Sequence, residues 1–249
     1  MEIEVLYEDN DTLVINKPVG LVVNRADSVS SPTVQDWAEN YLRIKYQVLS
    51  IKYGEKDIEL FLERSGVCHR LDKETSGCLV IAKNPDALRY YLKLFKERKL
   101  IKEYVALVHG RVEPSEGTVI LPMKRSLFDR EKWQVHYEGK KAVTSWKVID
   151  RFTYEGSEHW KNALSYLRLY LKTGRTHQIR VHLSFLGWPI FADEKYLNKE
   201  LAERDRKYLS HHFLHAEKLV FNSFGGEEVE VVAPLPLDCQ VLLKRMVSD

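Results

Sequence analysis

Asp72 is the residue whose type and position most suggest chemistry, because a carboxylate can act as a nucleophile or can simply shape a turn. It lies within segment 66–83, whose two ends are apolar and typical of strands, with a polar stretch between them. Thr75, Ser76 and Gly77 are the expected turn formers. Judged by spacing alone, the carboxylate of Asp72 accepts hydrogen bonds from nearby backbone N–H groups. The pattern places Asp72 at the end of a strand.

Arg175 is a second candidate, at the joint between a predicted strand and a predicted helix. Segment 165–171 alternates Tyr and Arg with Leu, a period of two that predicts a strand. Thr176 is expected to cap the following helix, which ends at Gly187. In the simplest interpretation, Arg175 is a surface residue that pairs with any neighbouring carboxylate.

His211, His212 and His215 raise the question of a metal site, since imidazole is a common metal ligand. No carboxylate or thiolate with ligand spacing stands near them in the sequence. We therefore expect no metal ion in this protein.

Three further segments have clear patterns. Asn84 and Pro85 are expected to start a helix with one apolar face toward the core. That face carries Leu88, Tyr91, Leu92 and Phe95. Segment 31–46 predicts another helix, and segment 101–110 predicts a strand by its β-branched and aromatic content. Tyr104 lies in that strand, where a tyrosine usually packs in the core.

The start of the chain predicts short strands over 4–6 and 12–16, followed by a turn at Pro18 and Gly20. In this strand–turn–strand arrangement, Lys17 is expected to be exposed to solvent. Segment 114–152 alternates turns with short strands and predicts antiparallel hairpins.

Basic residues are concentrated in two segments, although the formal net charge of the chain is only +2. Segment 89–102 holds six basic residues and one acidic residue. Segment 122–147 holds seven basic and three acidic residues, with Trp133, His136 and Tyr137 among them. Either segment could contact nucleic-acid phosphates or form a solvated surface of mixed charge.

The chain has 249 residues, of which 44% are hydrophobic, enough for a large core in one extended domain or two closely packed lobes. Its three cysteines are too few and too scattered for a disulfide framework, which suits a reducing compartment. The first ten residues do not resemble a signal peptide, and no apolar run approaches membrane-spanning length. We therefore expect a cytoplasmic protein that does not bind membranes.

Segment 69–77, His-Arg-Leu-Asp-x-x-Thr-Ser-Gly, resembles the signature of the RluA-type RNA pseudouridine synthases. Segment 174–183, Gly-Arg-Thr-His-Gln-Ile-Arg-x-His-Leu, resembles a second long motif of that family. Shorter resemblances are Asn-Lys-Pro-x-Gly-Leu at 16–21 and Lys-x-Tyr-x-Ala-Leu-Val-x-Gly at 102–110. Ala192 stands where the family commonly has Gly, which puts a turn conformation in question.

The resemblance implies that Asp72 is the catalytic nucleophile and that Arg175 pairs with its carboxylate. Tyr104 would lie against the target base and could accept a proton. The expected substrate-binding residues are His69, Arg70 and Thr75, of which Arg70 would fill the gap left by the flipped nucleotide. The attack of Asp72 on the sugar carbon and its attack on the pyrimidine ring are both open.

The same resemblance implies an α+β fold with a mixed, mainly antiparallel central sheet and flanking helices, in a single catalytic domain over 1–249. The reaction would convert uridine in rRNA or tRNA to pseudouridine by breaking the N1–C1′ bond and joining C5 to C1′, without a metal or an organic cofactor. The expected partner is structured RNA and not DNA, which favours an RNA-facing role for 122–147. A monomer is expected, with no S4-like RNA-binding domain before the catalytic part.

Two other functions are open. A non-catalytic RNA-binding protein could retain the fold, but it would be free to lose Asp72, Tyr104 and Arg175, which are all present. A carboxylate hydrolase of the glycosidase type would need a partnered acid, and the sequence offers no candidate at an evident position.

Overall fold

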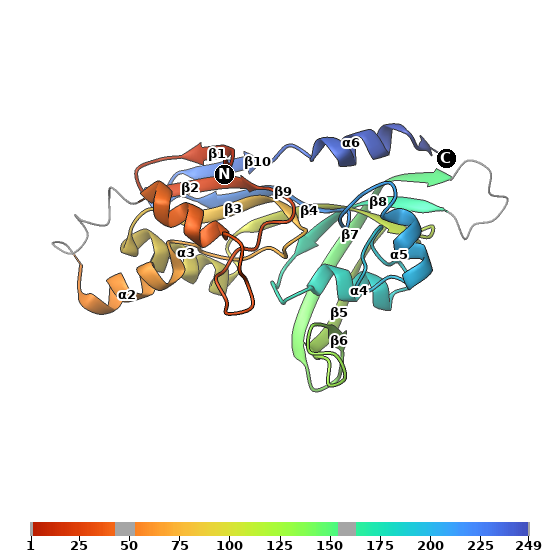
Figure 1. Cartoon of the computed structure of the whole chain (residues 1–249), viewed down its shortest axis with the longest axis horizontal. Coiled ribbons are helices and arrows are strands. Elements are labelled where there is room, and N and C mark those ends of the chain that lie inside the picture. The colour runs from red at the N-terminus through yellow and green to blue at the C-terminus, as the bar shows by residue number, and fades with distance from the viewer. Residues whose placement is uncertain (1, 43–52, 154–162, 249) are drawn as a thin grey trace. The chain divides into compact units, whose positions relative to one another are not determined.

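The computed structural model describes residues 2–42, 53–153 and 163–248 and divides the chain into two compact units (Figure 1). Unit 1 comprises Met1–Ile101 and Ala216–Pro234, and unit 2 comprises Lys102–His215 and Leu235–Asp249. The chain therefore leaves unit 2 once and returns to it. That 1–249 acts as a single catalytic domain stays a prediction.

Unit 1 is built on strands in the order β1-β2-β3-β9, with β10 paired to β9. The strands are β1 (Val5–Glu8), β2 (Thr12–Lys17), β3 (Ser76–Ala82), β9 (Leu214–Asn222) and β10 (Glu228–Val232). Antiparallel registers join β1 to β2, β2 to β3, and β10 to β9. Unit 1 also contains the helices α2 (Glu55–Arg64) and α3 (Pro85–Glu97) and the helical residues 34–42. The predicted helix over 31–46 is thus confirmed in part, and 43–46 lie outside the described residues.

Helix α3 starts where the sequence predicts. The side chain of Asn84 accepts a hydrogen bond from the backbone N–H of Ala87 at 2.9 Å, and Pro85 occupies the first turn. On the expected face, Leu88 and Tyr91 are buried, whereas Leu92 and Phe95 are half-buried. The spacing of apolar residues was therefore a sufficient signal here.

Strand β3 is buried along its whole length, and it begins earlier than the sequence predicts. Ser76 and Gly77 belong to the strand and not to the turn before it. Gly77 has φ 108°, and a Cβ added to it would lie 2.2 Å from the carbonyl oxygen of Ala216 in β9. The glycine is needed because the neighbouring backbone approaches closely.

Unit 2 is built on a second run of strands in the order β4-β8-β7-β5-β6. These are β4 (Ile101–His109), β8 (Leu164–Leu171), β7 (Lys140–Thr153), β5 (Glu116–Arg125) and β6 (Trp133–Val135), with β11 (Val247–Ser248) paired to β7. All neighbours in this run are antiparallel, which confirms the hairpins predicted over 114–152. The helices of unit 2 are α4 (Gln178–Phe185), α5 (Lys199–Asp205) and α6 (Leu237–Lys244).

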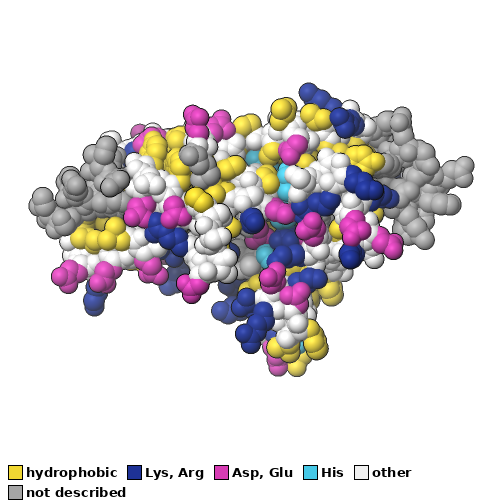
Figure 2. Space-filling view, viewed as in Figure 1, with side chains coloured by type: hydrophobic (Ala, Val, Ile, Leu, Met, Phe, Trp, Pro, Cys, Tyr) yellow, Lys and Arg dark blue, Asp and Glu magenta, His cyan; other side chains and the backbone are white. Residues whose placement is uncertain are grey.

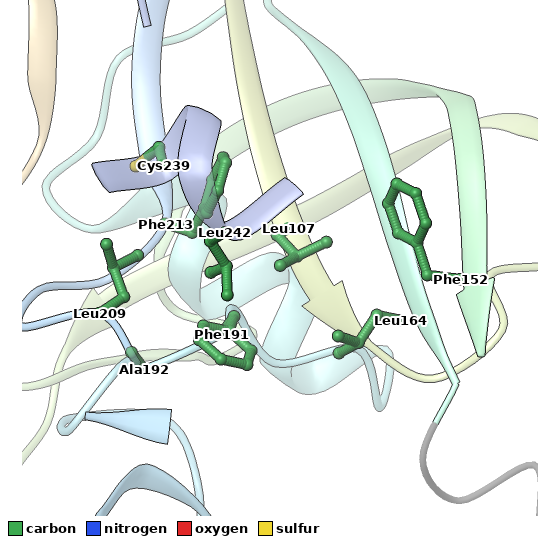
Figure 3. Packing of buried hydrophobic residues seen from close by; sticks show 9 residues of the cluster. All are labelled: Leu107, Phe152, Leu164, Phe191, Ala192, Leu209, Phe213, Cys239 and Leu242. Atoms are coloured by element: carbon green, nitrogen blue, oxygen red, sulfur yellow. The ribbon is translucent and has the colours of Figure 1, made fainter. Parts of the chain in front are cut away.

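A cluster of buried apolar side chains holds β4, β8 and α6 together (Figure 3). Its members are Leu107, Phe152, Leu164, Phe191, Ala192, Leu209, Phe213, Cys239 and Leu242. Ala192 has φ 61°, a left-handed conformation that costs a residue with a Cβ roughly 1–2 kcal/mol. Its backbone N–H donates to Asp205 Oδ2 at 3.1 Å, so the turn is kept although alanine replaces glycine there.

Helix α4 begins differently from the prediction. The residue at its N-terminal cap is His177, with φ 54°, and not Thr176. The side chain of His177 does not cap this helix, and its Nδ1 lies 2.8 Å from the hydroxyl of Tyr196. Gly187, with φ 84°, follows the end of the helix as expected.

A buried ion pair ties α4 to the segment that follows it. Arg180 donates from Nε to Asp193 Oδ2 at 2.7 Å and from Nη2 to Oδ1 at 2.8 Å, and the two side chains are 6% and 0% exposed. Burial raises the pKa of Asp193, but the hydrogen bonds and charge of Arg180 outweigh it and lower the pKa overall. Asp193 also accepts from the backbone N–H of Lys195 at 3.0 Å. The Asp193 carboxylate therefore holds the backbone of the turn and also neutralises the charge of Arg180.

None of the helices in the described parts of the chain is long and apolar enough to cross a membrane.

We expect Asp193→Asn to lower the free energy of unfolding by about 3–5 kcal/mol, because it leaves the buried Arg180 guanidinium without its counter-charge. Urea denaturation measures this loss. Glu203→Gln is a matched control, since its pair with Lys199 spans 3.8 Å between side chains that are 66% and 89% exposed. The control should change stability by less than about 0.5 kcal/mol, and equal losses in the two variants would contradict the assignment.

Candidate active site

Asp72 lies in a tight turn directly before β3. Its backbone carbonyl accepts the N–H of Thr75 at 3.1 Å, which closes the turn through Lys73 and Glu74. The Asp72 residue is half-buried, whereas Lys73 is exposed. The prediction that Asp72 lies at a strand end is confirmed for β3, but the apolar residues before it form no strand and contribute only the bridge of Val67 to Ile81.

Lys17 does not lie where its sequence pattern predicts. It was expected to be exposed, but it is 0% exposed at the end of β2. Its ammonium donates to three backbone carbonyls, those of Pro18 at 2.7 Å, Leu21 at 2.9 Å and Lys73 at 3.0 Å. Three acceptors match the three N–H donors of a lysine, so the buried cation is fully hydrogen-bonded.

The charge of this lysine is coupled to Asp72. Burial lowers the pKa of Lys17 to about 7, and the negative charge of Asp72 acts in the opposite direction. The backbone N–H of Gly20 also donates to the carbonyl of Lys73 at 2.9 Å. The loop after β2 and the turn that carries Asp72 are thus fastened to each other at Lys73.

The other predicted residues of this motif are placed as follows. The Nε2 atom of His69 accepts the backbone N–H of Val80 at 3.1 Å, and its ring packs on Phe95 with 4.5 Å between the ring centroids. Thr75 is buried, and Arg70 is exposed. His69 therefore helps to hold β3 and α3 together, and the substrate contacts of all three residues stay predictions.

Tyr104 lies on β4 in unit 2, opposite Leu169 of β8. It is 8% exposed, which agrees with the core packing expected of a strand tyrosine. The side chain of Lys102, two residues earlier, lies close to the segment that carries Arg175, because a Cβ added to Gly174 would be 3.6 Å from its Nζ. Within unit 2, the start of β4 and the joint before α4 are therefore neighbours.

Arg175 is exposed at the joint between β8 and α4, as predicted. The joint is held by the buried amide of Gln178, whose Oε1 accepts the backbone N–H of Arg175 at 3.0 Å and the hydroxyl of Thr173 at 2.7 Å. The Nε2 atom of Gln178 donates to the Val143 carbonyl and to the Thr144 hydroxyl, both at 3.0 Å. A single side chain fixes the backbone on which Arg175 stands.

The structure brings together, within unit 1, the turn with Asp72 and the buried Lys17. Tyr104 and Arg175 belong to unit 2. The positioning roles of Lys17 and Gln178 were not predicted from the sequence. The signal in the sequence is that both residues lie inside segments that resemble family motifs, at 16–21 and 174–183. Polar residues in such segments are candidates for a functional or a positioning role.

The sequence matches the family model described as RNA pseudouridylate synthase over residues 11–185. A ribosomal large subunit pseudouridine synthase D of Buchnera aphidicola subsp. Acyrthosiphon pisum (strain APS) is 35% identical over 253 residues, 98% of this chain and 73% of the relative. An uncharacterized RNA pseudouridine synthase of Bacillus subtilis (strain 168) is 34% identical, over 99% of this chain and 73% of its own length.

A solved structure, human RNA pseudouridylate synthase domain containing 1, has a TM-score of 0.68 at 28% identity and covers 94% of this chain and 83% of its own. The predicted fold class, a mixed and mainly antiparallel sheet with flanking helices, is confirmed by this similarity and by the antiparallel registers of both units. The resemblance to the RluA-type enzymes is confirmed as well. The chain belongs to the family of RNA pseudouridine synthases, which are isomerases.

Proposed function

We propose that Asp72 is the nucleophile with which this enzyme converts uridine to pseudouridine. The observation that carries this proposal is the fastening of its turn by the buried ammonium of Lys17. A nucleophilic carboxylate must be ionised and held in one position while a base is detached, turned and rejoined. The Lys17 cation favours the ionised form of Asp72 and limits the movement of the turn.

Arg175 and Tyr104 are the proposed partners from unit 2. A guanidinium is always charged at neutral pH, so Arg175 suits the role of offsetting a carboxylate that substrate binding removes from water. Tyr104 offers an aromatic face for a base and a hydroxyl for proton transfer. The Gln178 amide supports the first assignment, because it holds the Arg175 backbone while leaving the side chain exposed.

We propose structured RNA as the substrate, in the first place large-subunit ribosomal RNA, which the names of several relatives specify. A monomer that acts in the cytoplasm and does not bind DNA is part of the same proposal. Segment 122–147 supports the binding of RNA, because five of its basic residues are exposed: Arg125, Arg130, Lys140, Lys141 and Lys147. In Figure 2, Lys and Arg side chains gather over β5 and β6, with hydrophobic side chains at the end of that hairpin.

Two exposed aromatic residues lie among these charges. Phe128 is 97% exposed and Tyr137 is 83% exposed. Cations that contact phosphates, combined with aromatic rings on which bases can stack, are typical of surfaces that bind single-stranded RNA. Segment 89–102 is a weaker candidate, because Arg89 pairs with Asp57 and Asp86, and Lys93 and Lys99 face Glu97.

We expect Asp72→Asn to reduce pseudouridine formation by at least about a thousandfold, because the amide cannot act as a nucleophile. Carbodiimide-adduct primer extension on total RNA, from cells with and without the gene, measures the product and locates the modified uridines. The control is Asp27→Asn, which changes an exposed aspartate of unit 1 in the same way. Adducts that persist at wild-type level in Asp72→Asn would exclude Asp72 as the nucleophile, and a wild-type protein without product would favour a non-catalytic RNA-binding role.

We expect the double substitution Lys140→Gln and Lys141→Gln to weaken RNA binding and to reduce its dependence on salt. Each lysine that contacts a phosphate contributes roughly one unit to the slope of log K against log salt concentration. Filter binding at several salt concentrations measures this slope. Lys56→Gln, an exposed position on α2, serves as the control and should leave the slope unchanged. Unaltered slopes in the double variant would remove segment 122–147 from the RNA surface.

We expect the unfolding free energy of the protein, relative to that of a Lys17→Met variant, to rise between about pH 7 and pH 10. Burial lowers the pKa of Lys17 to about 7 in the folded state, while an unfolded lysine keeps its proton up to about pH 10.4. The unfolded chain then binds more protons than the folded one, so stability increases with pH, by at most about 1.4 kcal/mol per pH unit.

Urea unfolding of both proteins across this pH range measures the difference. The cost of the buried charge is present in full below about pH 7 and disappears as the pH approaches the unfolded pKa. Lys56→Met, at an exposed lysine, should show no such trend against the wild type. If the difference in unfolding free energy between the wild type and Lys17→Met is constant with pH, the pKa of Lys17 is not lowered in the folded state.

A further inference from the structure

We propose that His211, Asp238 and Cys239 form a binding site for a zinc ion, which goes beyond the RNA-modifying function. One ligand atom from each residue, a ring nitrogen, a carboxylate oxygen and a sulfur, lies within 4.8 Å of the others. Zinc accepts this mixed set of nitrogen, oxygen and sulfur ligands. This proposal departs from the expectation that the histidines at 211–215 bind no metal, which rested on the sequence near them, because Asp238 follows His211 by 27 residues.

The contacts of His211 place its Nε2 atom beside the carboxylate of Asp238. Its Nδ1 lies 3.1 Å from the backbone carbonyl of His212, and its Nε2 lies 2.9 Å from Asp238 Oδ2. Both ring nitrogens therefore face oxygen atoms. A metal ion at Nε2 satisfies both contacts, with Nδ1–H donating to a carbonyl as is usual for metal-binding histidines.

The surroundings fit a metal site that is closed on one side and open on the other. The side chain of His211 is 4% exposed and that of Asp238 is 50% exposed. Cys239 is buried in the apolar cluster of unit 2, on α6 and near Phe213 (Figure 3). An ion could enter beside Asp238, where a water molecule would complete a four-coordinate site.

The carboxylate of Asp238 is already oriented for this role. Its Oδ1 accepts the backbone N–H of Cys239 at 2.8 Å, in the first turn of α6, which leaves Oδ2 directed to His211. Zinc–ligand distances of about 2.0–2.3 Å place the ligand atoms of a tetrahedral site roughly 3.3–3.8 Å apart. Because His211 Nε2 and Asp238 Oδ2 already lie 2.9 Å apart, the widest pair includes Cys239 Sγ, which must approach by up to about 1 Å.

The charges balance when zinc binds. The Sγ–H bond of Cys239 breaks and its proton passes to solvent, so the thiolate and the Asp238 carboxylate together neutralise the divalent ion. No oxidant or reductant is needed.

The position of the site in the chain indicates a structural role. The chain leaves unit 2 after His215 and returns to it at Leu235, and the ligands stand just before the first crossing and just after the second. A bound ion would therefore join the two ends of this excursion and fix α6 to the segment that precedes β9. Structural zinc of this kind adds its binding free energy to the stability of the fold.

The test uses the 249-residue chain, free of any affinity tag and stripped of metal by a strong chelator. Titration with Co²⁺ should give one equivalent of binding and a near-ultraviolet band from thiolate-to-cobalt charge transfer, and one equivalent of Zn²⁺ should abolish that band. The thermal unfolding midpoint should rise with Zn²⁺. Cys239→Ser should lose the band, and Asp238→Asn should bind at least about tenfold more weakly.

Cys68→Ser is the matched control, because it alters another buried thiol, in unit 1, and should keep the band. A wild-type protein that shows no charge-transfer band, or a band that survives Cys239→Ser, would overturn the proposal and leave His211 as a partner of Asp238 alone. Circular dichroism checks folding, and Asp238→Asn at its half-exposed position gives a second reading if Cys239→Ser does not fold. None of these measurements depends on pseudouridine formation, so failure here is separate from failure of the RNA assay.

Discussion

The buried ammonium of Lys17 is the interaction on which the turn with Asp72 depends. An isolated charge in a protein interior costs several kcal/mol unless hydrogen bonds and an opposite charge offset the loss of water. The carbonyls of Pro18, Leu21 and Lys73 provide those hydrogen bonds, and they come from two segments separated by more than fifty residues. Any movement of the Asp72 turn away from β2 would leave the cation without one of its acceptors. The cost of burying the charge thereby becomes a constraint on the position of the carboxylate.

In unit 2, neutral side chains hold the backbone of the candidate residue Arg175. Arg175 stands on backbone that the Gln178 amide holds, and the amide reaches β7 through Val143 and Thr144. The Thr144 hydroxyl also lies 2.9 Å from Nδ1 of His182 on α4, so the strand and the helix share one network. A neutral network costs less to bury than a charge. The charge of the guanidinium remains available to an anion.

The sequence predicted elements that depend on local spacing and missed groups that depend on distant neighbours. Helix α3 and strand β8 follow from the periods of their apolar residues, and the turn before β3 follows from its polar residues. Lys17 was placed wrongly because strand patterns describe which face a residue takes, and they do not show that a loop will fold over the strand end. The pairing of His211 with Asp238 was invisible for the same reason, since their separation in sequence hides their contact.

The residues of the second long motif show why such segments are informative even before their chemistry is known. Within 173–182, the side chains of Thr173, Gln178, Arg180 and His182 are all buried and polar, and each is hydrogen-bonded within unit 2. Buried polar groups tolerate little substitution, because removing one partner leaves the other unsatisfied in an environment that water does not reach. Arg175 differs from these four because it is exposed although its backbone is held firmly. Holding the backbone of an exposed charge in place does not stabilise the fold. The rigid backbone at Arg175 is better explained by a function that requires its guanidinium in one position.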